Sequence, residues 1–289
     1  MTRPTDRWTR PDGQTVDEED RGLVYDVRTL VDRRRVLGLF GGAGAAGLLA
    51  ACGLSGASDG ATAASSRTGA ASGSGATAAA AGLTEVPDET GGPFPADGSN
   101  GPNVLDDSGI VRRDIRSSFG SSTTTAAGVP LTVRLTVRDA ATGDVLSGAA
   151  VYLWHCDREG DYSLYSDAAR DENYLRGVQE VDASGTATFT SIFPGCYSGR
   201  WPHIHFEVYG ALDDAVASGP IVKTSQIALP KEACESVYAT DGYETSVRNL
   251  EGTSLYGDNA FGDDGGVHQI ASMSGEVESG YTAALTIGV

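Results

Sequence analysis

Positively charged residues are scarce in this chain of 289 residues. It contains 21 Lys and Arg against 39 Asp and Glu, which gives a net charge of −18. Residues 1–51 hold eight Arg and eight acidic residues, so the rest of the chain carries all of the excess negative charge and has only two lysines, Lys223 and Lys231. Such acidity argues against binding to nucleic acid and against electrostatic attraction to anionic lipid. We interpret the charge as a contribution to solubility.

A long hydrophobic run is also missing. The apolar stretch at residues 36–51 is short and rich in glycine, which argues against a membrane span. Arg33-Arg34-Arg35 precedes it, and Leu49-Ala50-Ala51-Cys52 ends it. This order of charged, apolar and small residues is typical of an export signal. The arginines resemble a twin-arginine signal, although Asp32 stands where Ser or Thr is usual.

The end of this stretch resembles a lipobox, in which the cysteine is lipidated. We therefore predict that residues 1–52 are a twin-arginine-type lipoprotein signal and that Cys52 is the lipid anchor. The protein is then expected to be exported to the outer face of the cytoplasmic membrane. The alternative is a buried, Ala-rich helix with a chance cysteine. It is disfavoured because the tract that follows offers such a helix nothing to pack on.

Large apolar residues are nearly absent from residues 53–83, which consist mainly of Ala, Ser, Gly and Thr. A segment of this composition cannot bury a core and is predicted to be a flexible tether. The folded part is therefore expected at residues 84–289, the size of one all-β domain.

Apolar and polar residues alternate in several parts of this region, as in half-buried strands. Glycine-containing turns separate them, and only residues 230–239 have a clearly helical pattern. We predict a β-sandwich of mainly antiparallel strands with long loops and little helix. The expected strands lie at 131–137, 149–156, 186–193, 202–209, 221–229 and 281–289.

Cysteines are few and do not show the CxxC spacing of a thiolate metal site. Once Cys52 is assigned to the lipobox, Cys156, Cys196 and Cys234 remain. An exported protein can form disulfides, so one bond with one thiol left over is possible. We favour Cys196–Cys234, although three pairings are open.

Histidines are equally few, yet two of the four lie at positions 203 and 205 in an expected strand. Side chains two residues apart project from the same face, so His203 and His205 form half of a metal site. Tyr197 and Tyr162 are candidates for the other half, because each lies beside a glycine-containing turn or loop. Phenolate oxygen suits Fe(III), whereas Zn(II) sites usually use Cys, His and carboxylate. The set points to ferric iron.

These residues lie in segments that resemble the intradiol ring-cleavage dioxygenases. Residues 89–94 and 111–115 are similar to the opening segment of that family, and the resemblance extends to about residue 229. The matching segments are, in order, Trp154-His155 through Gly160-Asp161-Tyr162-Ser163, Ser191-Ile192-Phe193-Pro194-Gly195-Cys196-Tyr197, Arg200-Trp201-Pro202-His203-Ile204-His205 and Thr224-Ser225-Gln226-Ile227.

The resemblance implies a non-haem Fe(III) enzyme that uses O₂ to cleave a small aromatic diol of the catechol type to a cis,cis-muconate-type diacid. It implies that the metal ligands are Tyr162, Tyr197, His203 and His205, of which Tyr197 would be displaced by the substrate. Arg200 and Gln226 would border the substrate and stabilise charge. The resemblance leaves the oligomeric state open.

A different class of function fits the export signal and acidic surface equally well. The chain would then be a non-catalytic exported lipoprotein whose β-sandwich binds a metal, a polysaccharide or a partner. Oxygen uptake with catechol separates the two classes. His155 and His268 are expected to be structural or exposed rather than ligands.

Overall fold

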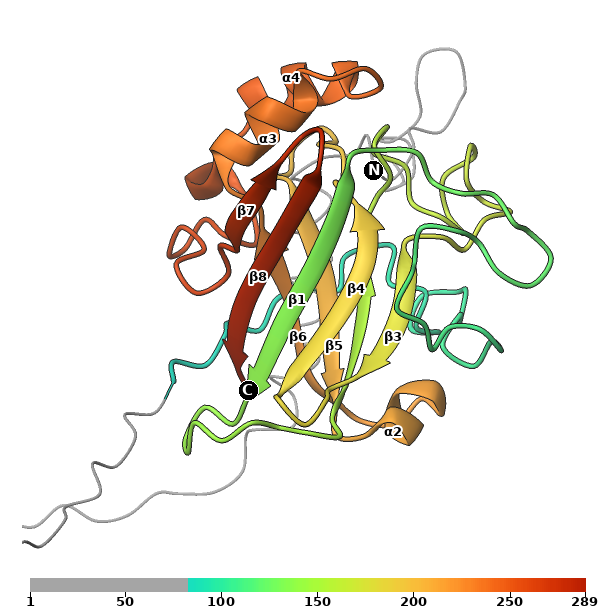
Figure 1. The fold of residues 1–289 in the computed structure, drawn as a ribbon, viewed down its shortest axis with the longest axis vertical. Helices are drawn as coiled ribbons and strands as arrows, with labels where there is room; N and C mark the ends of the chain where they lie inside the picture. The colour runs from blue at the N-terminus through green and yellow to red at the C-terminus, as the bar shows by residue number, and fades with distance from the viewer. Residues whose placement is uncertain (1–82) are drawn as a thin grey trace, which may run out of the picture.

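The computed structural model describes residues 83–289, which form a β-sandwich (Figure 1). The predictions for the signal at 1–52 and for nearly all of the tether at 53–83 lie outside the described residues and stay predictions. Within 83–289, no helix has both the length and the apolar character needed to cross a membrane.

Eight strands form two four-stranded sheets. The first sheet has the order β4-β1-β8-β7 and the second has the order β3-β2-β5-β6. Neighbouring strands are antiparallel except β1 and β8, which pair in parallel. The bounds are β1 Pro130–Arg138, β2 Ala150–Trp154, β3 Arg176–Glu180, β4 Thr186–Ile192, β5 His203–Tyr209, β6 Ile221–Ala228, β7 Ser272–Glu276 and β8 Gly280–Gly288.

The main core lies between the two sheets. Apolar residues at alternate positions of β1, such as Leu135, are buried there together with Val151 and Leu153 of β2. The residues between them in β2, Tyr152 and Trp154, belong to a second buried cluster on the opposite face of the sheet. Long loops cover this face, so β2 and β5 are buried on both sides.

Helices are short and lie at the ends of the sandwich. In Figure 1, α3 (Lys231–Tyr238) and α4 (Glu244–Glu251) lie together at one end, and α2 (Leu212–Val216) lies at the other. Within residues 83–289 there is also one 3₁₀ turn, η3, which spans Leu255–Gly257. The predicted fold class is confirmed, and helix α3 occupies the expected position at 230–239.

Strands β3 and β7 and the eight-residue helix α4 were not predicted. Strand β3 is short and ends in polar residues, and strand β7 reads Ser-Met-Ser-Gly-Glu, with a single large apolar side chain. Strand β7 lies at the edge of its sheet and pairs only with β8, so little of its surface is buried. Its position depends on pairing with a distant strand rather than on a local hydrophobic pattern.

The expected disulfide Cys196–Cys234 is not formed. Cys156, Cys196 and Cys234 are buried free thiols. Each of the two thiols contacts a backbone carbonyl: Cys196 Sγ is 3.5 Å from the oxygen of Arg200, and Cys234 Sγ is 3.9 Å from that of Leu229. The preference for this pairing was therefore wrong.

Candidate metal centre

Two histidines of β5 form the base of the candidate site. Ile204 and Phe206 of β5 enter the core between the sheets, so His203 and His205 project from the opposite face. Both histidines are buried, and their Nε2 atoms lie 3.1 Å apart. Adjacent ligands of a metal with bonds of about 2.1 Å lie roughly 3 Å apart when the bonds are at right angles. The two nitrogens are spaced as neighbouring ligands would be.

A hydrogen bond orients one imidazole ring, and ring stacking packs against the other. The Nδ1 of His203 lies 2.5 Å from the carbonyl oxygen of Trp201, which can only accept a hydrogen bond. This bond places the proton on Nδ1 and leaves the lone pair of Nε2 free for a metal. Trp154 stacks on His205 with ring centroids 4.9 Å apart and an angle of 5° between the planes. Burial, with the charge of Arg200 adding to it, lowers the pKa of His203 well below its usual range, so the ring is neutral.

Tyr197 reaches the same point from the loop before β5. Its hydroxyl lies 3.1 Å from Nε2 of His203, and its side chain is only partly buried. The loop packs tightly against Gly160, where a Cβ would lie 3.2 Å from the Cβ of Tyr197. Gly160 has a φ of 98°, which favours glycine. Gly160 therefore allows the Tyr197 loop to approach the loop that follows β2 closely.

Tyr162 completes the group from the loop after β2. Its ring lies edge-on to both Tyr197 and His205, with centroid distances of 5.8 Å and 6.3 Å. The side chain is fully buried, and within residues 83–289 its hydroxyl has no hydrogen-bond partner of normal geometry. Burial, with Tyr197 adding to it, raises the pKa of Tyr162 well above its usual range. The structure thus brings the four sequence-predicted ligands together and leaves one buried phenol unsatisfied.

The donor set depends on tyrosine. Among the described residues, no group of three or more His, Cys, Asp or Glu side chains could hold a metal ion. A site with two histidines alone would be incomplete for zinc, which usually takes four ligands of those types. When the phenol oxygens of Tyr162 and Tyr197 are included in the donor set, the site favours a hard, highly charged metal ion.

Arg200 lies beside the histidines and is almost fully buried. Its Nη1 is 3.4 Å from Nε2 of His203, and its Nη2 donates to Oε1 of Gln226 at 2.6 Å. Gln226 stands opposite His205 in the pairing of β5 with β6, which places it at the site. Gln226 in turn donates to the carbonyl oxygen of Thr90 at 2.8 Å, so the opening segment of the domain closes this side.

Asp258 is a residue that the sequence reasoning missed. Its carboxylate, which is fully buried, accepts bonds from Arg200 Nε at 3.0 Å and Nη2 at 3.2 Å, and from the backbone N–H of Trp201 at 2.6 Å. Asp258 lies in the Gly- and Asp-rich segment 241–266, where many acidic residues look alike in sequence. The segment reaches the site through Asp258, which connects it to Arg200.

Arg176 is a second missed residue, and it supports the loop of Tyr162. Its guanidinium is fully buried and donates to Oγ and to the carbonyl oxygen of Ser163, both at 2.9 Å. It also donates to the carbonyl oxygen of Pro95 and to the hydroxyl of Tyr152, both at 3.1 Å. One side chain therefore ties the Tyr162 loop to β2 and to the opening segment.

The other two histidines lie outside the site, as expected. His155 is buried and bonds to Oγ of Ser191 at 2.6 Å and to the carbonyl oxygen of Cys156 at 2.7 Å, which is a structural role. His268 is exposed.

Comparisons with known proteins show similarity at the level of sequence family and fold. A family model described as Dioxygenase matches residues 101–216. No curated protein matches the chain. An intradiol ring-cleavage dioxygenase from Tetranychus urticae has a similar structure, with 25% identity, a TM-score of 0.55 and coverage of 71% of this chain and 94% of the other. A second dioxygenase structure gives 24% identity, a TM-score of 0.57 and the same coverage.

A catechol 1,2-dioxygenase from Pseudomonas arvilla C-1 matches at 22% identity with a TM-score of 0.40, covering 61% of this chain and 55% of its own. The family model and the structure from Tetranychus urticae confirm the predicted resemblance.

Proposed function

From this relationship to the intradiol ring-cleavage dioxygenases, we propose that the chain is a non-haem Fe(III) enzyme that cleaves a catechol-type diol with O₂ to a cis,cis-muconate-type diacid. Similarity to this family supports a ring-cleaving dioxygenase in general. The Fe(III) cofactor, the diol substrate and the diacid product are our proposal. Tyr162, Tyr197, His203 and His205 would hold the iron. The observation that carries the proposal is the fully buried hydroxyl of Tyr162, which makes no hydrogen bond of normal geometry within residues 83–289 and has the hydroxyl of Tyr197 nearby.

A buried hydroxyl without a partner costs about 1–3 kcal/mol. The fold retains this cost at a point where two imidazole nitrogens 3.1 Å apart also converge. An ion bound by Tyr162 would remove the cost, because a metal acidifies a phenol and binds its oxygen directly. Ferric iron suits two phenolates and two imidazoles, so the residues fit the group.

Bound Fe(III) would withdraw electrons from the diol and prepare the ring for O₂. The protein would supply proton transfer at the hydroxyl of Tyr197. Tyr197 is partly exposed, whereas Tyr162 is fully buried, so Tyr197 is the phenol better placed to move. Once released as a phenolate, its oxygen would accept a proton from the incoming diol.

Arg200 would stabilise negative charge that develops on the substrate. Its guanidinium is already oriented by Asp258 and Gln226, so no reorganisation is needed when charge appears. Asp258 and Gln226 are positioning residues in this account.

Oxygen uptake by the iron-loaded full chain tests the proposal. We expect consumption of O₂ with catechol and formation of a muconate-type product that absorbs in the ultraviolet. A His203→Ala variant should lose both iron and activity, while His268→Ala, a change at an exposed histidine, should retain both. If the iron-loaded protein consumes no O₂ with any diol, the non-catalytic binding function becomes the better account.

A further inference from the structure

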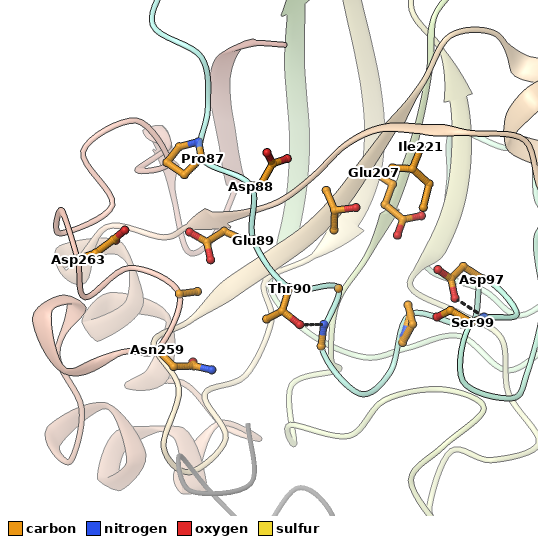
Figure 2. Close-up of a pocket in the computed structure, with 15 residues that line it drawn as sticks. Pro87, Asp88, Glu89, Thr90, Asp97, Ser99, Glu207, Ile221, Asn259 and Asp263 are labelled. Atoms are coloured by element: carbon orange, nitrogen blue, oxygen red, sulfur yellow. Dashed lines mark hydrogen bonds between the residues drawn. The ribbon is translucent and has the colours of Figure 1, made fainter. Parts of the chain in front are cut away.

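A cavity of about 610 Å³ lies beside β5 and β6, the strands that carry His205 and Gln226. Its walls come from residues 87–99, from β5 and β6, and from residues 259–263 (Figure 2). Sites for small organic molecules usually measure about 300–1,000 Å³. The cavity is therefore large enough for an aromatic ring that carries a substituent.

One hydrogen bond and two features of the backbone place this cavity next to the site. Glu207 lines the cavity and follows His205 on the same face of β5. The carbonyl oxygen of Thr90, another lining residue, accepts the bond from Gln226. At Gly92, also in the lining, a Cβ would lie 3.2 Å from Cε1 of His205. The wall of the cavity is thus hydrogen-bonded to Gln226 and passes close to His205 at Gly92.

The charge of the cavity wall has one sign. Five lining residues are acidic and none is basic; the five are Asp88, Glu89, Asp97, Glu207 and Asp263. In Figure 2, Glu207 and Asp97 lie at one end of the group of lining residues, and Glu89 and Asp263 lie at the other. Lys223 pairs with Asp88 at 2.9 Å from outside the lining, and within residues 83–289 the other four carboxylates form no salt bridge.

The carboxylates already influence one another. Burial, with the negative charge of Asp263 adding to it, raises the pKa of Glu89 to about 7. A substrate carboxylate in the same space would meet the same repulsion and would lose water on entering, whereas a cation would be attracted.

We propose that this cavity receives the ring substituent of the diol and selects catechols with a neutral or positively charged substituent over catechols with a carboxylate. The inference rests on the proposed function, because it assumes that a diol binds at the iron. It adds the class of substrate: the favoured diols are uncharged or cationic.

A matched series of diols tests the selection. Iron-loaded full-length protein at pH 8 is compared on 3,4-dihydroxybenzoate, 3,4-dihydroxybenzamide and 3,4-dihydroxybenzylamine. The first two have nearly the same shape and differ in charge. We measure kcat/KM from O₂ uptake, and Kd by calorimetric titration without O₂. We expect the benzoate to be at least about tenfold worse than the benzamide in both, which corresponds to one pKa unit of charge interaction. The benzylamine should match or exceed the benzamide.

A double variant assigns the effect to the cavity. Glu89→Gln with Asp97→Asn should reduce the preference for benzamide over benzoate by about tenfold, because two carboxylates are removed with little change in shape. Glu278→Gln is the control, since Glu278 is exposed in the turn between β7 and β8 and lies outside the lining.

The outcomes separate the two proposals. Equal kcat/KM and Kd for benzoate and benzamide in the wild-type protein would overturn the selection and leave the dioxygenase function standing, and this result does not depend on the variant folding. An unchanged preference in a folded double variant would also overturn it. If no diol binds or reacts, the proposed function fails and the selection fails with it.

Discussion

Replacement of Asp258 by Asn should destabilise the protein strongly. The side chain of Asp258 is 0% exposed and that of Arg200 is 5% exposed, so neither charge can be compensated by water. All the donors around the carboxylate are N–H groups, and the amide of Asn would turn its own NH₂ towards some of them. The removal of one partner from a buried ion pair typically costs about 3–5 kcal/mol.

Such a loss would be a large fraction of the total stability, which is about 5–15 kcal/mol for natural domains. Urea denaturation of the metal-free full chain measures it, and Asp258→Asn should lower the free energy of unfolding by about 3–5 kcal/mol. Asp114→Asn is the matched control. Asp114 pairs with Arg116 at 2.7 Å with both side chains exposed, so its loss should cost less than about 1 kcal/mol. If the free energy of unfolding of Asp258→Asn lies within about 1 kcal/mol of the wild-type value, the buried pair with Arg200 is not what holds the segment 241–266 at the site.

Three further changes test other parts of the site. Gly92→Ala and its control Gly120→Ala both place a side chain at positive φ, so each should cost about 1 kcal/mol of stability. Only Gly92→Ala should also weaken iron binding, because its Cβ would meet His205, whereas a Cβ at Gly120 meets nothing within 4 Å. Equal iron affinity in the two variants would contradict this. Arg200→Gln should destabilise the fold, because it leaves the buried carboxylate of Asp258 unpaired. In the folded, iron-loaded protein it should lower kcat by about 10²-fold while iron content and the visible spectrum are retained, because the residue acts on substrate charge; unchanged turnover would remove Arg200 from the mechanism. Arg176→Met should lower the urea concentration at the midpoint of unfolding and increase proteolysis within the Tyr162 loop. The reason is that Ser163, Pro95 and Tyr152 all lose the guanidinium that donates hydrogen bonds to them. A wild-type midpoint would show that these hydrogen bonds contribute little to stability.

Sequence reasoning reached those parts of the site that follow from local geometry. His203 and His205 are two apart in a strand, so their common face follows directly from the strand period. Tyr162 and Tyr197 were candidates because each lies beside a glycine-containing turn or loop, and the resemblance to a known family supported them; the folded chain brings all four together. Their role as metal ligands stays a proposal.

The parts that sequence reasoning missed depend on contacts between distant segments. Asp258 is one of many acidic residues in its segment, and its importance comes only from Arg200, which lies 58 positions earlier. Arg176 looks like an ordinary charged residue in β3, yet folding places it among carbonyl and hydroxyl oxygens of three other segments. The cysteine pairing failed for the same reason, since the direction of each thiol is set by the fold and not by spacing.

The ferric centre built on Tyr162 is the central claim, and the iron content and visible spectrum of the purified full chain test it most directly. The account predicts that the protein binds Fe(III) stoichiometrically with a visible tyrosinate-to-iron absorption band, and that the band weakens or disappears together with iron affinity in Tyr162→Phe. Tyr174→Phe is the control, because Tyr174 is a buried tyrosine that bonds to Asp157 and lies outside the ligand set. A colourless protein fully occupied by zinc would contradict the account.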